Sequence, residues 1–531
     1  MIVWPCRIKQ SRQYLKPQSL VCRLVQLYFF LLFAILLCCA VPAAASTYLD
    51  INDEAYALLS RLEAEGVVRS ALLTTRPISR TEAMRLLHEA EQNSEGSSAF
   101  IKSLVHELKL RLRTEESQPG SLKLLDTVYA KYINTNADVR TLTYGITPEK
   151  EQALNHNNDG DLYERGSNGR IGFTSRVEDV GRLSFFLNPE FKVSQSDGSK
   201  LIIKQGYAVF DFGWDLIAGK ESQWWGPGYH GAILLTNNAE PFTLVRISNP
   251  HPVILPWVFK YLGPFGFTFF VTQLEKDRAD VPEPYLWGMR MNFKPHPSIE
   301  IGLARTALLG GQGRPTNARI WWNSLTGRGE HCSDPTGCAD EAGDQRAGYD
   351  LKLSLPFDVQ PLQLYMEADG EDSYQKFMPR YWAYMYGLYL PRVLSLENLE
   401  FRLEWARTFD KRADKPTTWY LNNIYTSGYT YHGLIIGHHM GTDSRDAFTE
   451  LTYRFPEKKA RVSLAFDRIE HALSQDIHET ERDISLHAAL ALTKDLDLDL
   501  VYGYAWIDNK ENISGIAWEG HTVQGTITRR F

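Results

Sequence analysis

Over most of its length the chain alternates apolar and polar side chains with a period of two. In the segment 183–193, for example, Phe185 and Leu187 alternate with Ser184 and Asn188. The same pattern recurs at 210–216, 362–367, 401–405 and 496–506. Successive side chains of a β-strand point to opposite faces of a sheet. From about residue 122 onward, the sequence therefore predicts strands with one apolar face and one face of acids, bases and amides.

Two architectures contain such strands: a soluble sheet that buries its apolar face, and a transmembrane barrel that turns this face toward lipid. The predicted strands often run for about ten residues, longer than the five or six usual in soluble proteins. Full charges on the polar face suit a wet lumen. Aromatic residues gather at predicted strand ends, where an interfacial girdle would lie: Trp214, Trp287, Trp405 and Trp506. The last strand carries three apolar residues on one face: Val523, Ile527 and Phe531. These features favour a mainly β fold, a large antiparallel transmembrane barrel over residues 121–531. Roughly 23 residues per strand and connection give about 18 strands, and the number should be even.

The first 45 residues have the pattern of a secretory signal peptide. Five basic residues and no acid precede or flank an apolar run at 24–40, and Ala43, Ala44 and Ala45 follow. We expect cleavage after Ala45; an uncleaved membrane anchor and a lipoprotein using Cys38 or Cys39 are the alternatives. The mature chain then has 52 basic and 64 acidic residues, a balance that excludes duplex nucleic acid as a partner.

Residues 46–120 predict a small bundle of three amphipathic helices. Ser79 and Glu82 have capping-box spacing at the start of the second helix. We place this bundle in the periplasm, where it could contact a periplasmic partner.

Cys332 and Cys338, the two cysteines that follow the signal peptide, predict a small disulfide-closed loop in an oxidising compartment. A metal or redox pair, the alternative, lacks supporting His and Cys residues.

The segment 219–242 is the candidate binding site. Two adjacent tryptophans precede Gly226-Pro227-Gly228, which must turn. Indole faces beside amides and carboxylates suit sugar rings, which stack through CH groups and hydrogen-bond through hydroxyls. The candidate glycan-binding residues are Trp224, Trp225, Tyr229, His230, Asn237 and Asn238. The alternative is a folded-in loop with both tryptophans as packing anchors.

Other polar clusters give weaker predictions. A hydrolase using His438, Asp443 and Ser444 would need a geometry that closeness in sequence does not supply. A metal site at His438-His439 lacks i, i+4 spacing and a third ligand. Four acids could hold a cation or act as glycosidase acids, but a lumen wall is favoured: Glu367, Asp369, Glu371 and Asp372. We therefore predict no catalytic residues, no metal site and no cofactor.

Several motifs resemble the capsule assembly Wzi family. They are Trp224-Trp225-Gly226-Pro227-Gly228, the segment 234–242, Gly288-Met289-Arg290, the segments 301–307 and 310–315, and the segment 431–444. The resemblance covers most of the mature chain. It implies an 18-stranded outer-membrane barrel with a periplasmic helical bundle, and a lectin-like role that holds capsular polysaccharide at the cell surface. It implies no catalytic residues.

We expect a non-enzymatic protein of the bacterial outer membrane that retains capsular or exopolysaccharide. Its other partner would be outer-membrane lipid, including lipopolysaccharide. Two rival functions remain: a porin or solute channel, which the polar lumen fits equally well, and an outer-membrane glycan-modifying enzyme.

Overall fold

The computed structural model describes residues 44–112, 120–144, 147–195, 198–327, 343–374, 378–409 and 419–531. Two expectations fall outside these residues. Nearly all of the expected signal peptide lies in 1–43, and Cys332 and Cys338, the expected disulfide pair, lie in 328–342.

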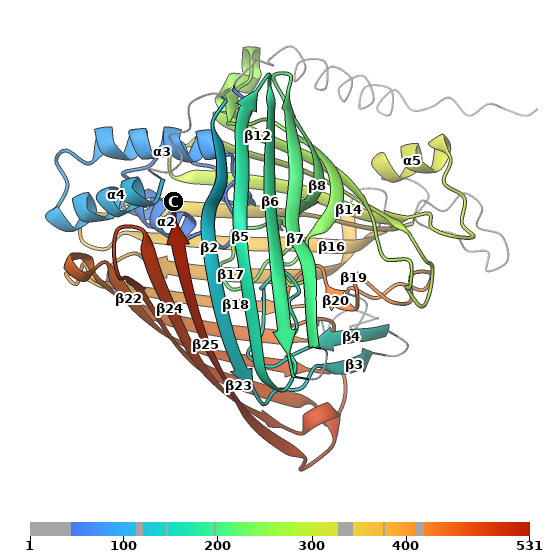
Figure 1. Ribbon diagram of the computed structural model, residues 1–531. Coiled ribbons are helices and arrows are strands. Elements are labelled where there is room, and N and C mark those ends of the chain that lie inside the picture. Colours follow the sequence, from blue (N-terminus) through green and yellow to red (C-terminus); the bar gives the residue numbers. More distant parts are fainter. Residues whose placement is uncertain are drawn as a thin grey trace, which may run out of the picture.

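Within the described residues, eighteen strands close an antiparallel β-barrel (Figure 1). The first nine are β2 (Leu122–Thr135), β5 (Gly166–Val180), β6 (Leu183–Ser194), β7 (Gly198–Asp211), β8 (Asp215–Glu221), β10 (Phe242–Ser248), β12 (Pro264–Gln273), β13 (Tyr285–His296) and β14 (Ile299–Leu309). The others are β15 (Asp344–Leu355), β16 (Leu362–Tyr374), β17 (Met378–Leu390), β18 (Leu399–Arg407), β21 (Arg445–Phe455), β22 (Ala460–His471), β23 (Glu479–Ala491), β24 (Leu496–Asp508) and β25 (Ala517–Arg530). Each pairs with the next barrel strand along the chain, and β2 pairs with both β5 and β25 to close the ring. The predicted barrel and its even strand number are confirmed.

The alternating pattern separates an apolar exterior from a polar lumen. On β6, Phe185 is 45% exposed, whereas Ser184 is fully buried and Glu190 is 4% exposed. Stacked aromatic rings line the exterior of β17 and β18, with ring centroids 6.0–6.3 Å apart: Trp382, Tyr384, Tyr386 and Trp405. Aromatic side chains of this kind favour the interface between lipid and water. The exterior therefore suits lipid, and the acids and bases of the strands point inward.

The two ends of the barrel differ in the length of their connections. One end has short turns, such as residues 181–182 between β5 and β6 and residues 212–214 between β7 and β8. The other end carries the long connections: residues 136–165, 222–241, 310–343 and 408–444. Helices of the N-terminal segment and the chain's last strand meet at the short-turn end (Figure 1).

Three helices form a bundle at the short-turn end: α2 (Ala55–Ala64), α3 (Arg80–Asn93) and α4 (Ala99–Leu112). Ser79 caps α3, because its hydroxyl oxygen accepts the Glu82 N–H at 3.0 Å, as the capping-box spacing predicts. The bundle is anchored to the lumen wall by α2. Its Glu63 accepts hydrogen bonds from Lys294 and Lys352 at 2.5 and 2.8 Å. None of the described helices has the length and hydropathy needed to cross a bilayer.

The segment before α2 runs inside the barrel rather than beside it. Tyr48 donates its hydroxyl proton to Asp215 at 2.6 Å and its backbone N–H to the Tyr207 hydroxyl at 2.9 Å. Farther along, β1 (Thr75–Arg76) pairs with β9 (Trp224–Trp225), a short strand of a loop from the opposite end. Parts of the N-terminal segment therefore reach into the barrel interior, whereas the three helices share an apolar core of their own.

A fourth helix, α5 (Ala318–Leu325), packs against the outside of the wall. It covers outward-facing side chains of β13 and β14, among them Trp287 and Leu309. The Trp287 indole N–H donates to the Ser324 hydroxyl at 2.9 Å, and both side chains are fully buried. Trp287, expected in a lipid-facing girdle, is thus covered by protein.

Candidate functional site

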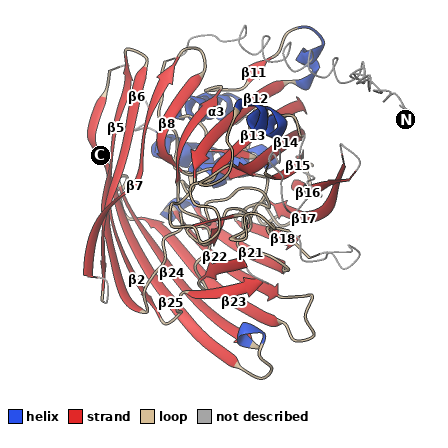
Figure 2. Cartoon of the chain, turned by 90° about the vertical axis from the view of Figure 1, so that its right-hand side faces the viewer, coloured by secondary structure: helices blue, strands red, loops and turns tan. Residues whose placement is uncertain are grey.

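Two long loops fold into the barrel at the long-loop end, and Figure 2 shows loops crossing the interior between the walls. We call these loops, residues 222–240 and 419–444, the plug. They pack against each other through buried side chains from both, including Trp225, Leu235, Tyr420 and Ile436. The backbone links them too, since the Thr236 N–H donates to the Ile436 carbonyl at 2.9 Å. The plug thus forms an apolar core inside a polar lumen.

Carboxylates of the barrel wall hold the first plug loop through its backbone. Glu404 accepts the N–H groups of Tyr229 and His230 at 2.7 and 2.9 Å. Glu367 accepts those of Ile233 and Leu234 at 3.1 and 3.3 Å. The role of Glu367 is therefore to fix the loop, in line with the favoured lumen-wall interpretation of the acids at 367–372.

Glycines of the turn are required by close packing. A Cβ on Gly228 would lie 1.8 Å from the Gly231 carbonyl oxygen. A Cβ on Gly231 would lie 2.3 Å from the His438 ring nitrogen Nε2. The Gly-rich sequence after the two tryptophans thus lets the two plug loops come together.

The six predicted glycan-binding residues fall into three groups. Trp225 and Asn238 are packing residues: the Trp225 ring lies 5.3 Å from that of Phe270, and the Asn238 amide donates to the Ile435 carbonyl at 3.0 Å. Trp224, Tyr229 and Asn237 line an internal cavity. His230 belongs to a separate cluster of histidines and aspartates. The packing-anchor alternative therefore describes Trp225 well, and neither indole lies at the surface, since Trp224 is 5% exposed.

The central cavity, of about 260 Å³, lies between α2, the plug and the wall formed by β16–β18 and β21. Aromatic rings and charged groups alternate around it: Trp224, Tyr229, Tyr365, Tyr389, Arg402 and Glu450. The Arg402 guanidinium lies 4.2 Å from the Tyr229 ring centroid and 4.1 Å from that of Tyr389. This lining combines flat apolar faces with hydrogen-bonding groups, as a sugar ring requires.

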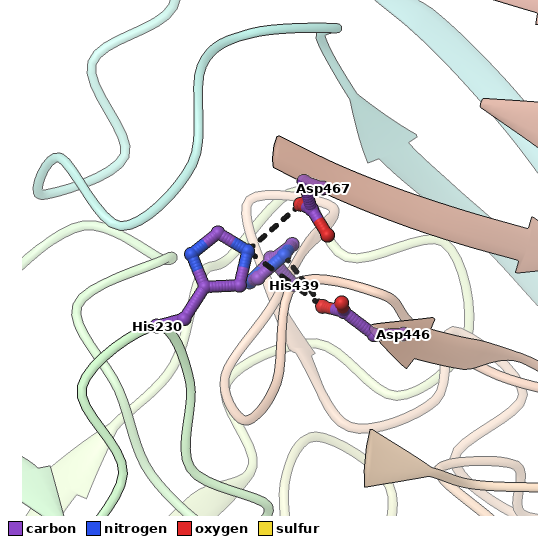
Figure 3. Close-up of side chains that lie close together, drawn as sticks. All are labelled: His230, His439, Asp446 and Asp467. Atoms are coloured by element: carbon purple, nitrogen blue, oxygen red, sulfur yellow. Dashed lines mark hydrogen bonds and ion pairs between the residues drawn. The ribbon is translucent and has the colours of Figure 1, made fainter. Parts of the chain in front are cut away.

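His230 and His439 meet two wall aspartates beside the plug (Figure 3). His230 Nε2 lies 2.8 Å from Asp467 Oδ2 and 3.7 Å from Asp446 Oδ2. His439 Nε2 lies 3.2 Å from Asp446 Oδ2. Sequence reasoning missed this cluster because the aspartates come from β21 and β22. The alternating pattern could place them on the lumen face, but not beside histidines of two loops.

Burial affects the loop histidines unequally. It lowers the pKa of His438 to about 3, and it also lowers the pKa of His439 and His156. Burial acts in the same direction on His230, but the adjacent Asp467 carboxylate outweighs it and raises the pKa of His230. Three of the four rings are therefore neutral at pH 7.

The hydrolase alternative meets a geometric obstacle. The Ser444 hydroxyl donates to the Thr442 carbonyl at 2.7 Å and lies 3.2 Å from Nδ1 of His471, not of His438 or His439. Asp443 instead accepts a hydrogen bond from the Ser474 hydroxyl at 2.6 Å. Because Ser444 is fully buried, a substrate carbonyl has no route to its hydroxyl.

Comparison with known proteins agrees with the barrel architecture. The family model of the capsule assembly protein Wzi matches residues 146–516. The chain belongs to the capsule assembly protein Wzi family. Within this Wzi family match lie the plug and sixteen of the eighteen barrel strands, so the family is defined over the same part of the molecule that contains the candidate site.

Among the individual proteins that are similar to this chain are one sequence relative and one solved structure. An uncharacterised 55.8 kDa protein from the cps region of Klebsiella pneumoniae is 27% identical over 323 residues, which are 59% of this chain and 56% of that protein. The chain thus matches little more than half the length of this relative. The solved structure of Escherichia coli Wzi, an outer-membrane, carbohydrate-binding β-barrel involved in group 1 capsule assembly, is 19% identical, with a TM-score of 0.68. That match covers 92% of this chain and 99% of E. coli Wzi. Family and fold agree that this chain is a β-barrel of the Wzi type.

Proposed function

We propose that this protein binds capsular or exopolysaccharide and retains it at the cell surface without changing it chemically. Membership in the Wzi family supports a role in capsule assembly. The observation that carries the proposal is the plug, which fills the lumen at the long-loop end with buried side chains. Because α2 is bound to the wall near the other end, transport through this lumen would require both obstacles to move.

The central cavity is the proposed binding site. Trp224 and Tyr229 would stack on sugar rings, and Asn237, Arg402 and Glu450 would bond to hydroxyl groups. Trp225 and Asn238 would act indirectly by holding the loop that carries Trp224 and Tyr229. Each contact is weak, but a long polymer can engage many copies in the membrane, so the overall avidity exceeds that of one site.

The proposed orientation follows the usual rule for outer-membrane barrels, whose short turns face the periplasm and long loops face the exterior. It places α2–α4 in the periplasm, available to a periplasmic partner, and the plug toward the capsule. Lipid and lipopolysaccharide would surround the apolar exterior.

The decisive experiment uses a clean deletion strain. Cell-bound and released polysaccharide are measured separately in the same culture. We expect an unchanged total with polymer shifted into the medium, and plasmid-borne protein should reverse the shift. An unchanged partition would reject retention, whereas altered polymer length would point to the enzyme alternative.

A second experiment tests the cavity with purified protein. Trp224→Ala and Tyr229→Ala should each weaken polymer binding about tenfold, since a stacked aromatic ring contributes on the order of 1 kcal/mol beyond its buried area. Trp322→Ala is the matched control, because Trp322 is 41% exposed on α5, outside the cavity. If only the control variant loses binding, the cavity is not the site.

Conductance separates this function from the channel alternative. In planar bilayers the wild-type barrel should be nearly silent. Steady ohmic conductance of the intact protein would favour a porin or solute channel.

A further inference from the structure

Four potential ligand atoms converge beside the plug. They come from His230, His439, Asp446 and Asp467, one atom from each, and all lie within 4.8 Å of one another (Figure 3). Ligands about 2.05 Å from a tetrahedral ion stand about 3.3 Å apart. The separations of 3.2 and 3.7 Å from Asp446 to the two imidazoles bracket this value. The 2.8 Å contact between His230 and Asp467 is shorter than this value and would need to widen.

Several polar atoms of these residues are buried without a hydrogen bond. Both carboxylate oxygens of Asp446, one oxygen of Asp467 and the Nε2 atom of His439 have no hydrogen-bond partner. These three residues are 2%, 5% and 7% exposed, respectively. A buried polar atom left unpaired costs about 1–3 kcal/mol, and more if charged. A cation at the centre of the cluster would supply the missing partner of His439 Nε2 and of one carboxylate oxygen of Asp446.

Charge compensation at this cluster differs from that of the surrounding lumen. Many wall acids elsewhere are paired with arginine, as in Glu221–Arg246 and Asp350–Arg290 at 2.9 and 2.7 Å. A neighbouring acidic group, Glu479 and Glu481, is paired with Arg140. In the described part of the chain, Asp446 and Asp467 have ion partners that are all histidines. Two buried aspartates therefore face one another without a fixed cation.

We propose that His230, His439, Asp446 and Asp467 bind one transition-metal dication of the Zn²⁺ type. Two imidazoles and two carboxylates are ligands that Zn²⁺ accepts in tetrahedral sites, whereas Ca²⁺ and Mg²⁺ favour all-oxygen sites. In the sequence, a metal site at His438-His439 lacks a third ligand. Asp446 and Asp467 provide the further ligands for His439, and they come from strands rather than from its own loop. The ion ties both plug loops, through their histidines, to β21 and β22. The His156 ring, stacked 4.4 Å from that of His439, covers the site.

Metal content of the full-length protein tests this proposal. The protein is purified in detergent without a polyhistidine tag, stripped with a chelator, incubated with Zn²⁺ or Co²⁺ and desalted. We expect about one ion per chain by elemental analysis, and a Co²⁺ absorption spectrum typical of tetrahedral nitrogen and oxygen ligands. Zn²⁺ should also raise the melting temperature of the stripped protein.

Asp446→Asn and His439→Gln should reduce Zn²⁺ affinity well over tenfold, since even residues behind metal ligands contribute 10–100-fold. The matched control is His487→Gln. His487 forms a similar imidazole–carboxylate pair with Asp499 at 3.1 Å, but it is in none of the ligand clusters found among the described residues. This control should bind as the wild type does. Heat-modifiable electrophoretic mobility verifies folding of each variant.

Two results would overturn the proposal. One is a folded wild-type protein that takes up neither Zn²⁺ nor Co²⁺ in stoichiometric amount. The other is undiminished binding by folded Asp446→Asn and His439→Gln proteins. The wild-type measurement alone decides the matter if the variants do not fold, and it is independent of whether the barrel binds glycan.

Discussion

Replacing Glu404 by glutamine should release the first plug loop. Glu404 accepts three hydrogen bonds, from the Tyr229 and His230 N–H groups and from the Tyr365 hydroxyl at 2.5 Å. Glutamine keeps the shape but removes the charge, and its NH₂ group must face one of these donors. The variant therefore loses one charge-assisted hydrogen bond, each worth about 1.5–3 kcal/mol, and weakens the other two.

The expected loss is about 3 kcal/mol in the free energy of opening the loop. At about 1.4 kcal/mol per factor of ten, the open population rises roughly a hundredfold. Hydrogen exchange followed by mass spectrometry should show this as a roughly hundredfold loss of protection in the peptide containing Tyr229 and His230.

Glu450→Gln is the control for this experiment. Glu450 lines the same cavity but contacts the loop through the Tyr229 hydroxyl alone, at 3.4 Å. Protection should change less than about threefold in this variant. If Glu404→Gln leaves protection of the loop unchanged in a folded barrel, the wall carboxylates do not hold the plug.

Three further variants test other contacts. Gly231→Ala should destabilise the plug by about 1–3 kcal/mol, because its Cβ would displace the His438 ring; chemical denaturation checks this. Burial raises the pKa of Glu149 from 4.5 to about 7, so folding favours its protonated form. The stabilisation is full below pH 4.5 and is lost as pH rises through 7, by an amount on the order of 3 kcal/mol. After correction for intrinsic exchange, the Thr442 amide should thus be less protected at pH 8 than at pH 5.5, and Glu149→Gln should abolish the difference. Ser324→Ala leaves a buried indole N–H unpaired, so limited proteolysis should cut residues 310–327 faster.

The barrel could be predicted from sequence because its pattern is local. The polarity of the side chains alternates along each strand. Ser184 and Phe185 can therefore be assigned to opposite faces of the sheet without knowing which distant residues they contact. The helix boundary at Ser79 is equally local, since Glu82 lies three residues away. Strand number followed from length alone.

The interior could not be predicted in this way. Tyr229 and Glu404 are 175 residues apart, and no local pattern shows that one captures the other. Trp225 was a candidate for binding because its sequence neighbours are polar and turn-forming, but in the structure its neighbours are buried apolar residues of both plug loops. A metal site at His439 could not be predicted because its own loop contains no further ligands. Asp446 and Asp467, which lie beside it in the structure, belong to the strands β21 and β22.

The pairing of β1 with β9 has a consequence for assembly in the membrane. Residues 44–76 lie within the ring, held by side chains of β5, β7 and β8 and joined to a loop from the far end. The ring itself is sealed by β2 against β25, so the seam joins the two strands farthest apart along the barrel sequence. We expect the part of the chain synthesised first to be enclosed as that seam forms. In this order of events, insertion of the last strand completes the wall around a centre that is already in place.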